Sequence, residues 1–394
     1  MLTKKYIIKF IYFYISSKII IYLLSFIMNI NFLQIFKIED LGNPDLEWND
    51  LHYKTVDTQN DSNYTREKSV VLINSGTLDE DSFRLELAQV ISKIKQFNPK
   101  SIGIDIDFDN DSKIGTKELI NVINYDTRIV VASDTTTNRK FKVDFKAKKG
   151  VVNFPNTNYG SIRSYFSDDS TFGHRLAKIA YPNRIKNELS KNKEFTIHYS
   201  TLEGGIANCD SFATTGINDF KFINADNLLN KLDQVEFYKD QIKNKIIIIG
   251  HLGEILNDSN DKHRVPCDTS QFILRDKKMY GAVIHANAIE NIIHPSSRYL
   301  ELNKFENMLL EEILFIIFLC LLFCEFGRLI NILILVILSI IYIIFIIKIM
   351  DFKIYIKVSN TLLYLLIIEE FYDVLHPYYL KFLKKLKFDN HEKK

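Results

Sequence analysis

The sequence gathers acidic side chains in one short segment that could bind a cation. Asp105 and Asp107 alternate with isoleucines in SIGIDIDF at 101–108, and two more aspartates, Asp109 and Asp111, follow directly. Carboxylate oxygens are the ligands that hard divalent cations prefer. The end of a strand that leads into a solvated turn explains the same residues, and we favour that plainer interpretation. We therefore predict Asp105 and Asp107 as ligand-binding residues without assigning a metal site.

A second polar group follows the apolar run at 245–250. Asp258, Asp261 and His263 lie in this stretch, and loops after buried strands often carry function. The carboxyl ends of parallel strands meet at one edge of a sheet, so this group could converge with the first. A flexible polar loop is the simpler explanation of the three residues by themselves.

The segment at 281–293, GAVIHANAIENII, predicts a helix that packs onto the sheet, and it carries His285 and Asn287. Two roles are open for His285. A buried histidine that hydrogen-bonds a backbone carbonyl is preferred over one that contacts a ligand. Asn287 is expected to tie a neighbouring loop, and both residues are included among the candidate ligand-binding residues.

No catalytic residue, metal or cofactor is predicted. The sequence contains no GxSxG, HExxH or phosphate-binding loop. Its net charge of +2, from 50 basic and 48 acidic residues, gives no reason to expect nucleic-acid binding. Cys209 and Cys267 lie in the polar part of the chain, where an oxidising compartment would allow a disulfide between them.

The middle of the chain alternates strand and helix patterns, which predicts an α/β fold. Its sheet is expected to be mixed but largely parallel, with flanking helices and right-handed crossovers. In 101–108 the isoleucines should share one face and the aspartates the other. Strands are predicted at 69–75, 101–108, 128–133, 150–154, 162–166, 195–200 and 245–250, and helices at 83–94, 115–124, 171–180 and 281–293.

Both ends of the chain are apolar, and a bilayer-spanning helix needs about 20 mostly apolar residues. An uncleaved N-terminal signal anchor is predicted within 1–30. Lys18 lies near its middle, at a cost of about 2.5–3.5 kcal/mol on insertion scales. Glu312 is expected near the headgroups. Three further spans are predicted within 306–373, namely 308–326, 329–350 and 352–372.

Lys4 and Lys5 near the start and a basic tail at 374–394 favour the cytoplasm for both termini. Lys348, Lys353 and Lys357 on the opposite side disagree, and the balance favours cytoplasmic termini. The domain between them, 31–305, is then extracytoplasmic. We predict a multi-pass protein of the cytoplasmic (inner) membrane whose main domain lies on the periplasmic side.

Several of these segments, in this order, resemble the second type of CHASE domain, a sensory extracellular module associated with cyclases and histidine kinases. The resemblance rests on VVLINSGTLDEDSF, FNPKSIGIDIDF, KELINVINYDTRIVVAS, GVVNF, NKIIIIG and YGAVIHANAIENII. It implies an N-terminal span, an outside sensor domain and several later spans. One departure is Asn74, which stands where the family carries an acidic residue. Another is the short tail, where members usually continue into an output domain.

These observations leave three hypotheses. The first is a membrane-anchored sensor that binds an unknown extracytoplasmic ligand and relays its state to a separate signalling or envelope partner. The second is a scaffold subunit of an envelope complex. The third, which we favour least, is a metal-dependent hydrolase built on Asp105, Asp107, Asp258 and His263. The lipid bilayer is a predicted partner in the first, and a homo-oligomer is left open.

Overall fold

The computed structural model divides the chain into two compact units, residues 52–299 and residues 1–51 with 300–394. Each unit is described by itself. The structure describes residues 4–29, 67–108, 113–134, 143, 145–155, 162–185, 194–199, 206–208, 220–231, 234–252, 262–265, 278–302, 304–322, 328–355 and 375–382.

A seven-stranded sheet forms the centre of the larger unit, in the order β4-β3-β2-β9-β1-β8-β7. Every pairing in it is parallel, so the described part of this sheet is not mixed. The strands are β1 (Val70–Asn74), β2 (Ser101–Asp105), β3 (Ile129–Ser133), β4 (Lys148–Val151), β7 (Ile206–Asn208), β8 (Phe220–Asn224) and β9 (Ile246–Gly250).

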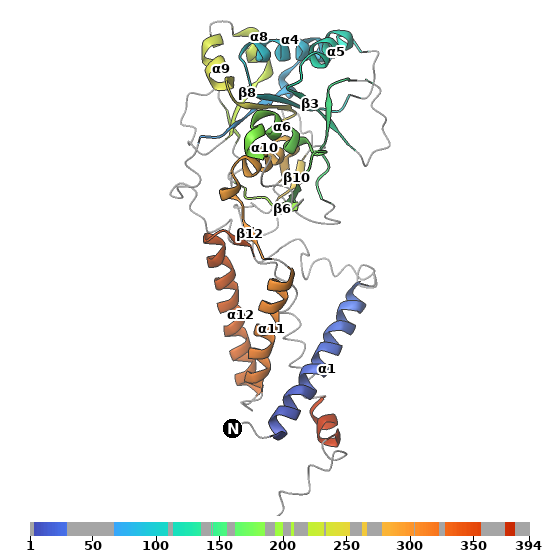
Figure 1. Ribbon diagram of the computed structural model, residues 1–394, viewed down its shortest axis with the longest axis vertical. Helices are drawn as coiled ribbons and strands as arrows, with labels where there is room; N and C mark the ends of the chain where they lie inside the picture. The colour runs from blue at the N-terminus through green and yellow to red at the C-terminus, as the bar shows by residue number, and fades with distance from the viewer. Residues whose placement is uncertain are drawn as a thin grey trace, which may run out of the picture. The chain divides into compact units, whose positions relative to one another are not determined.

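Helices cover both faces of the sheet, which gives three layers (Figure 1). One face carries α4 (Phe83–Gln96), α5 (Thr116–Asn124), α8 (Ala225–Asn230) and α9 (Val235–Ile242). The main hydrophobic core lies under these helices, because alternate residues of β2 such as Ile102 and Ile104 point into it. The alternation expected from SIGIDIDF is confirmed.

The opposite face carries α6 (Phe172–Ala180) and α10 (Gly281–Ile293) (Figure 1). Gly103 makes room for α6, since a Cβ there would lie 2.6 Å from side-chain atoms of both Phe172 and Leu176. Gly250 does the same for α10, with 3.0 Å to Cβ of Ala282. Both glycines let a helix approach the sheet closely, and Gly250 lies within β9 rather than in a turn.

Two short antiparallel pairs lie outside the main sheet. β5 (Ser164–Phe166) pairs with β6 (Glu194–Thr196), and β10 (Lys262–Arg264) pairs with β11 (Lys278–Tyr280). The segments 162–166 and 195–200 are therefore shorter strands than predicted, and they do not join the main sheet. Short elements here are η2 (Ser75–Thr77), α7 (Pro182–Ile185) and η4 (Pro295–Ser297).

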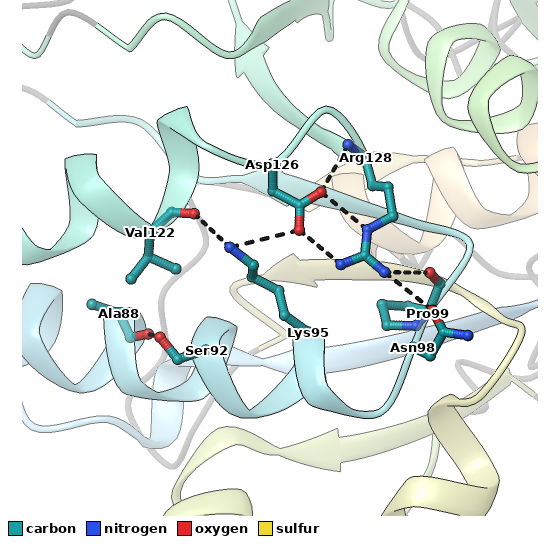
Figure 2. A network of polar contacts seen from close by, with 8 residues as sticks. All are labelled: Ala88, Ser92, Lys95, Asn98, Pro99, Val122, Asp126 and Arg128. Carbon is teal, nitrogen blue, oxygen red and sulfur yellow. Dashed lines mark hydrogen bonds and ion pairs between the residues drawn. The ribbon is translucent and has the colours of Figure 1, made fainter.

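An ion-pair network fixes the chain where it enters β2 and β3 (Figure 2). Asp126 accepts hydrogen bonds from Nε and Nη2 of Arg128 at 3.0 and 2.8 Å, and Lys95 of α4 lies 3.6 Å from the same carboxylate. Arg128 also donates to the carbonyl of Pro99 at 3.3 Å, and Lys95 to that of Val122 at 3.1 Å. The network joins the ends of α4 and α5 to the starts of two neighbouring strands.

The smaller unit is helical. It contains α1 (Lys4–Asn29), α11 (Lys304–Leu322) and α12 (Arg328–Asp351), and residues 375–382 are also helical. Phe13 of α1 packs on Tyr379, with ring centroids 5.6 Å apart. Taken over their described residues, none of these helices is both long enough and apolar enough to cross a membrane. β12 (Leu300–Glu301) pairs with β13 (Ile354–Tyr355), so the first residues of the predicted third span form a bridge.

Several predicted features lie outside the described residues. Asp258 and Asp261 are among them, and so are both cysteines of the suggested disulfide, Cys209 and Cys267. The last residues of the basic tail and most of the segment 356–374 lie outside as well.

Candidate functional site

Asn74, the last residue of β1, connects the carboxyl ends of the central strands by hydrogen bonds. Its Oδ1 accepts hydrogen bonds from the backbone of Gly76 at 3.0 Å and of Leu252 at 3.1 Å. Its Nδ2 donates to Oδ1 of Asn224 at 3.2 Å. One amide thus joins the ends of β1, β8 and β9, which explains why a neutral residue with both a donor and an acceptor suits this position.

Asp105 ends β2 on the side of the sheet that α6 and α10 cover. It lies two residues after Gly103, and residues two apart in a strand share a face. Its neighbour in the sheet is Gly250 of β9. Asp105 is half-buried, whereas Asp107, two residues beyond the strand, is exposed. The two aspartates that the sequence pairs are therefore in different environments.

A buried hydrogen-bond chain lies beside this edge. The backbone N–H of Gly173, in the first turn of α6, donates to the hydroxyl oxygen of Tyr165 at 2.9 Å. The Tyr165 hydroxyl lies 3.0 Å from Nδ1 of His285. The direction of this bond follows the tautomer of the imidazole: when the ring hydrogen is on Nε2, the hydroxyl donates to Nδ1.

Burial keeps both side chains in their neutral forms. His285 is 1% exposed, and burial, with a smaller contribution from His263, lowers its pKa to about 3. Burial also raises the pKa of Tyr165, and the carboxylates of Asp105 and Asp168 act in the same direction. Both side chains therefore remain neutral throughout the physiological pH range.

Aromatic rings enclose the imidazole of His285. Phe154 stacks on it with centroids 4.8 Å apart, and Phe172 meets it edge-on at 5.2 Å. His263 of β10 contacts the same Phe154 ring at 5.1 Å. His263 and His285, which come from two separate segments of the sequence, thus both contact the ring of Phe154. Asp105 acts electrostatically on the Tyr165 hydroxyl beside them.

All thirteen residues of α10 are buried, and each of its polar side chains has a hydrogen-bond partner. Asn287 donates to the carbonyl of Val283 in the preceding turn at 3.0 Å. Glu290 accepts from the backbone N–H of Val70 at 3.0 Å, and from that of Ser69. Burial raises the pKa of this carboxyl. The helix is thus joined to the start of β1 as well as to the site at His285.

The end of α10 is held equally firmly. The side chain of Asn291 exchanges two hydrogen bonds with the backbone of His198, at 2.6 and 3.1 Å. Arg298 donates to the carbonyls of Asn291 at 2.6 Å and Ile292 at 3.3 Å, and its guanidinium lies 4.7 Å from the ring of Phe195. Capping of the last carbonyls by a cation stabilises a helix end.

A second cluster contains the residue types of a hydrolytic triad. Ser167 Oγ lies 3.0 Å from Nδ1 of His174, and Nε2 of His174 lies 3.2 Å from Oδ1 of Asp169. The exposure of these side chains does not suit nucleophilic attack. Ser167, which would be the nucleophile, is 1% exposed, whereas the Asp169 side chain is 72% exposed. Burial lowers the pKa of His174. The cluster fastens the loop before α6 onto that helix.

The structure thus brings together three of the seven candidate residues, namely Asp105, His263 and His285. His285 is buried as expected, but its partner is a hydroxyl rather than a carbonyl. Sequence reasoning missed Tyr165 and Phe154, which lay in predicted strands with no mark of function. Within the described residues there is no group of three His, Cys, Asp or Glu side chains placed to hold a metal ion.

A three-layer α/β domain with polar groups at the carboxyl edge of a parallel sheet belongs to a broad class of ligand-binding folds. Over residues 41–324, most of its length, the chain matches the family model of the CHASE2 domain. The chain belongs to this family. CHASE2 is an extracellular sensor domain of signal transduction rather than a catalytic one, and no effector domain is identified beside it. No curated protein and no solved structure matches the chain.

Proposed function

We propose that this protein is a membrane-anchored sensor whose CHASE2 domain binds a small extracytoplasmic ligand at the carboxyl edge of its sheet. The observation that carries the proposal is the hydrogen-bond chain from Gly173 through Tyr165 to His285. The chain holds a buried imidazole against a tyrosine hydroxyl on which the Asp105 carboxylate acts, and pre-organised sets of donors and acceptors orient ligands.

The chemistry of the site favours an uncharged or cationic ligand. Nε2–H of His285 can donate to a carbonyl or hydroxyl oxygen, and the Asp105 carboxylate can accept from an amine or hydroxyl group. A neutral imidazole and a carboxylate offer an anion no opposite charge. His263, and Asp107 in an exposed position, remain candidates at the rim of the site. Asp258 and Asp261, which the sequence places between β9 and β10, lie outside the described residues and remain candidates from the sequence.

Helix α10 supplies a route from this site toward the rest of the chain. His285 and Asn291 are six residues apart, which is about 9 Å along a helix. His285 lies at the proposed site. Asn291, near the C-terminal end of the domain, is hydrogen-bonded to the backbone of His198. Because α10 is buried along its whole length, a shift at one end would move the other. A ligand changes the state of the protein only if it binds two arrangements unequally.

The membrane anchor is supported by the sequence and by exposed apolar side chains. No charged residue occurs between Arg328 and Lys348 of α12. Leu333, Ile337 and Ile341 of this helix are each about half exposed, as they would be toward lipid. We propose an inner-membrane protein with the CHASE2 domain outside, which signals through a separate partner protein.

A scaffold subunit is the second candidate function. The firm hydrogen bonding along α10 favours it, because a rigid domain can present a surface to envelope proteins without binding any ligand. The metal-dependent hydrolase is less well supported, since Asp107 is exposed whereas Asp105 is half-buried.

The test is to purify the full chain in detergent and identify what accompanies it by native mass spectrometry. The sensor predicts a stoichiometric small molecule, with a signalling protein as a second associated species. A chain that carries envelope proteins but no small molecule, and that no extracytoplasmic metabolite stabilises against heat, would favour the scaffold.

A further inference from the structure

A polar cluster joins α1 to α11 within the smaller unit. Lys18 of α1 forms an ion pair with Oε1 of Glu312 in α11. The hydroxyl of Tyr14 donates to the other oxygen, Oε2, at 2.9 Å. Tyr14 and Lys18 are four residues apart, so they lie on the same face of α1. One helix therefore binds both oxygens of a carboxylate that the other helix presents.

An aromatic ring completes the cluster. Phe315 lies one turn after Glu312 and is 2% exposed. The Lys18 ammonium lies 4.6 Å from its centroid, within the range of a cation–π interaction. The ring of Tyr14 meets the same ring edge-on at 5.7 Å. One further residue from each helix, Tyr14 of α1 and Phe315 of α11, thus flanks the ion pair.

Among residues 7–20 of α1, whose side chains the structure describes, the exposed ones are apolar. Ile7, Ile11, Ile15 and Ile19 recur every four residues and are each about half exposed. A lysine in such a helix is costly in lipid unless it is paired. Glu312 provides that partner, so the sequence expectation of an isolated Lys18, with Glu312 at the headgroups, is replaced by a pair between helices.

We propose that the Lys18–Glu312 pair is a charge lock that holds α1 and α11 in one fixed register. The inference rests on the membrane anchor proposed above. In the chain, α1 precedes the compact unit of residues 52–299 and α11 follows it, so the lock joins the two helices that flank this unit in the sequence. Loss of either partner would leave one charge unpaired between apolar helices, while exchange of the two residues would preserve the pair.

Disulfide cross-linking of the full chain in membranes tests the lock. Tyr14→Cys and Phe315→Cys are introduced after the four native cysteines are replaced by alanine. These two positions flank the ion pair, so the parent of the series lacks the contacts of Tyr14 and Phe315 but keeps both charges, and the yields report the ion pair alone. After oxidation, mass spectrometry measures the yield of the linked peptide. Resistance of the CHASE2 domain to protease shows in each variant that the protein is folded.

The lock predicts that Lys18→Met or Glu312→Gln lowers the yield at least about fivefold, since the remaining, partly buried charge would have no opposite charge between apolar helices. Lys18→Glu combined with Glu312→Lys should restore the yield to within about twofold of the parent. Glu306→Gln is the matched control and should change nothing, because Glu306 is exposed on α11 and six residues away from Glu312, on a different face of the helix.

Unchanged yield in both single variants would overturn the lock, and so would an exchanged variant as low as the singles. Sedimentation of the membranes separates this result from the proposed anchor. A chain recovered in the soluble fraction would contradict the anchor, while the cross-link yields would still report the pairing of the two helices.

Discussion

The hydroxyl of Tyr165 and Nδ1 of His285 lie 3.0 Å apart, and this buried hydrogen bond fixes the orientation of the imidazole. The tyrosine comes from a short strand 120 residues earlier in the chain. Its own oxygen is held by the backbone of Gly173, so the position of α6 determines the orientation of a side chain on α10.

Removal of this hydroxyl should destabilise the domain. In Tyr165→Phe, the N–H of Gly173 and Nδ1 of His285 both lose their partner in a buried environment. We expect the free energy of unfolding to fall by about 1–3 kcal/mol. Urea denaturation of the full chain measures it. Tyr125→Phe is the control and should be neutral, because Tyr125 is 85% exposed. An equally small change in both variants would show that the buried bond contributes nothing.

The burial of His285 predicts a pH dependence of stability. Its pKa is about 3 in the folded protein and about 6.5 in an unfolded chain, so the unfolded state binds the proton first as the pH falls. The contribution of neutral His285 is therefore present above about pH 6.5 and is lost below it, by at most about 1.4 kcal/mol per pH unit. Unfolding curves at pH 7 and pH 5 should show a smaller loss in His285→Gln. A loss of equal size in both proteins would contradict this assignment.

Glu290 should have the opposite dependence. Burial raises its pKa, so between the unfolded value of about 4.3 and the folded value the native state binds the extra proton. Its contribution is then present at low pH and is lost as the pH rises through that interval. We expect Glu290→Gln to gain stability relative to the wild type as the pH is raised from 4 to 8. Glu118→Gln, at an exposed position of α5, should keep a constant difference from the wild type.

The network in Figure 2 predicts an acid-sensitive contact. The hydrogen bond from Arg128 holds the pKa of Asp126 below its ordinary value. The contact therefore stabilises the fold above about pH 3.9 and is lost as the pH falls through the folded pKa. Asp126→Asn should cost about 1–2 kcal/mol at pH 7 and less at pH 3. The exposed Asp240→Asn on α9 should cost almost nothing at either pH. A cost for Asp126→Asn that does not change with pH would contradict the ionic contribution.

The local pattern of the sequence predicted much of the sheet. The alternation in 101–108 correctly placed Ile102 and Ile104 in the core and Asp105 on the opposite face. The helix at 281–293 was also predicted correctly, because the segment begins with a glycine and its apolar residues recur at helical spacing.

The order of the strands could not be predicted in the same way. A run such as IIIIG at 246–250 predicts a buried strand, but nothing in it indicates that β9 inserts between β1 and β2. Tyr165 illustrates the same difficulty at the site. Its role depends on contacts with α6 and α10, and a tyrosine in a short strand carries no local sign of them.

The central claim is that the carboxyl edge around Asp105 and His285 binds a ligand. Its most direct test compares two aspartates that are two residues apart, with native mass spectrometry of the purified full chain as the measurement. Asp107→Asn, at the exposed position, should retain the small molecule at the wild-type stoichiometry. Asp105→Asn and His285→Ala should lose it while remaining folded. Equal retention by all three variants would contradict the account.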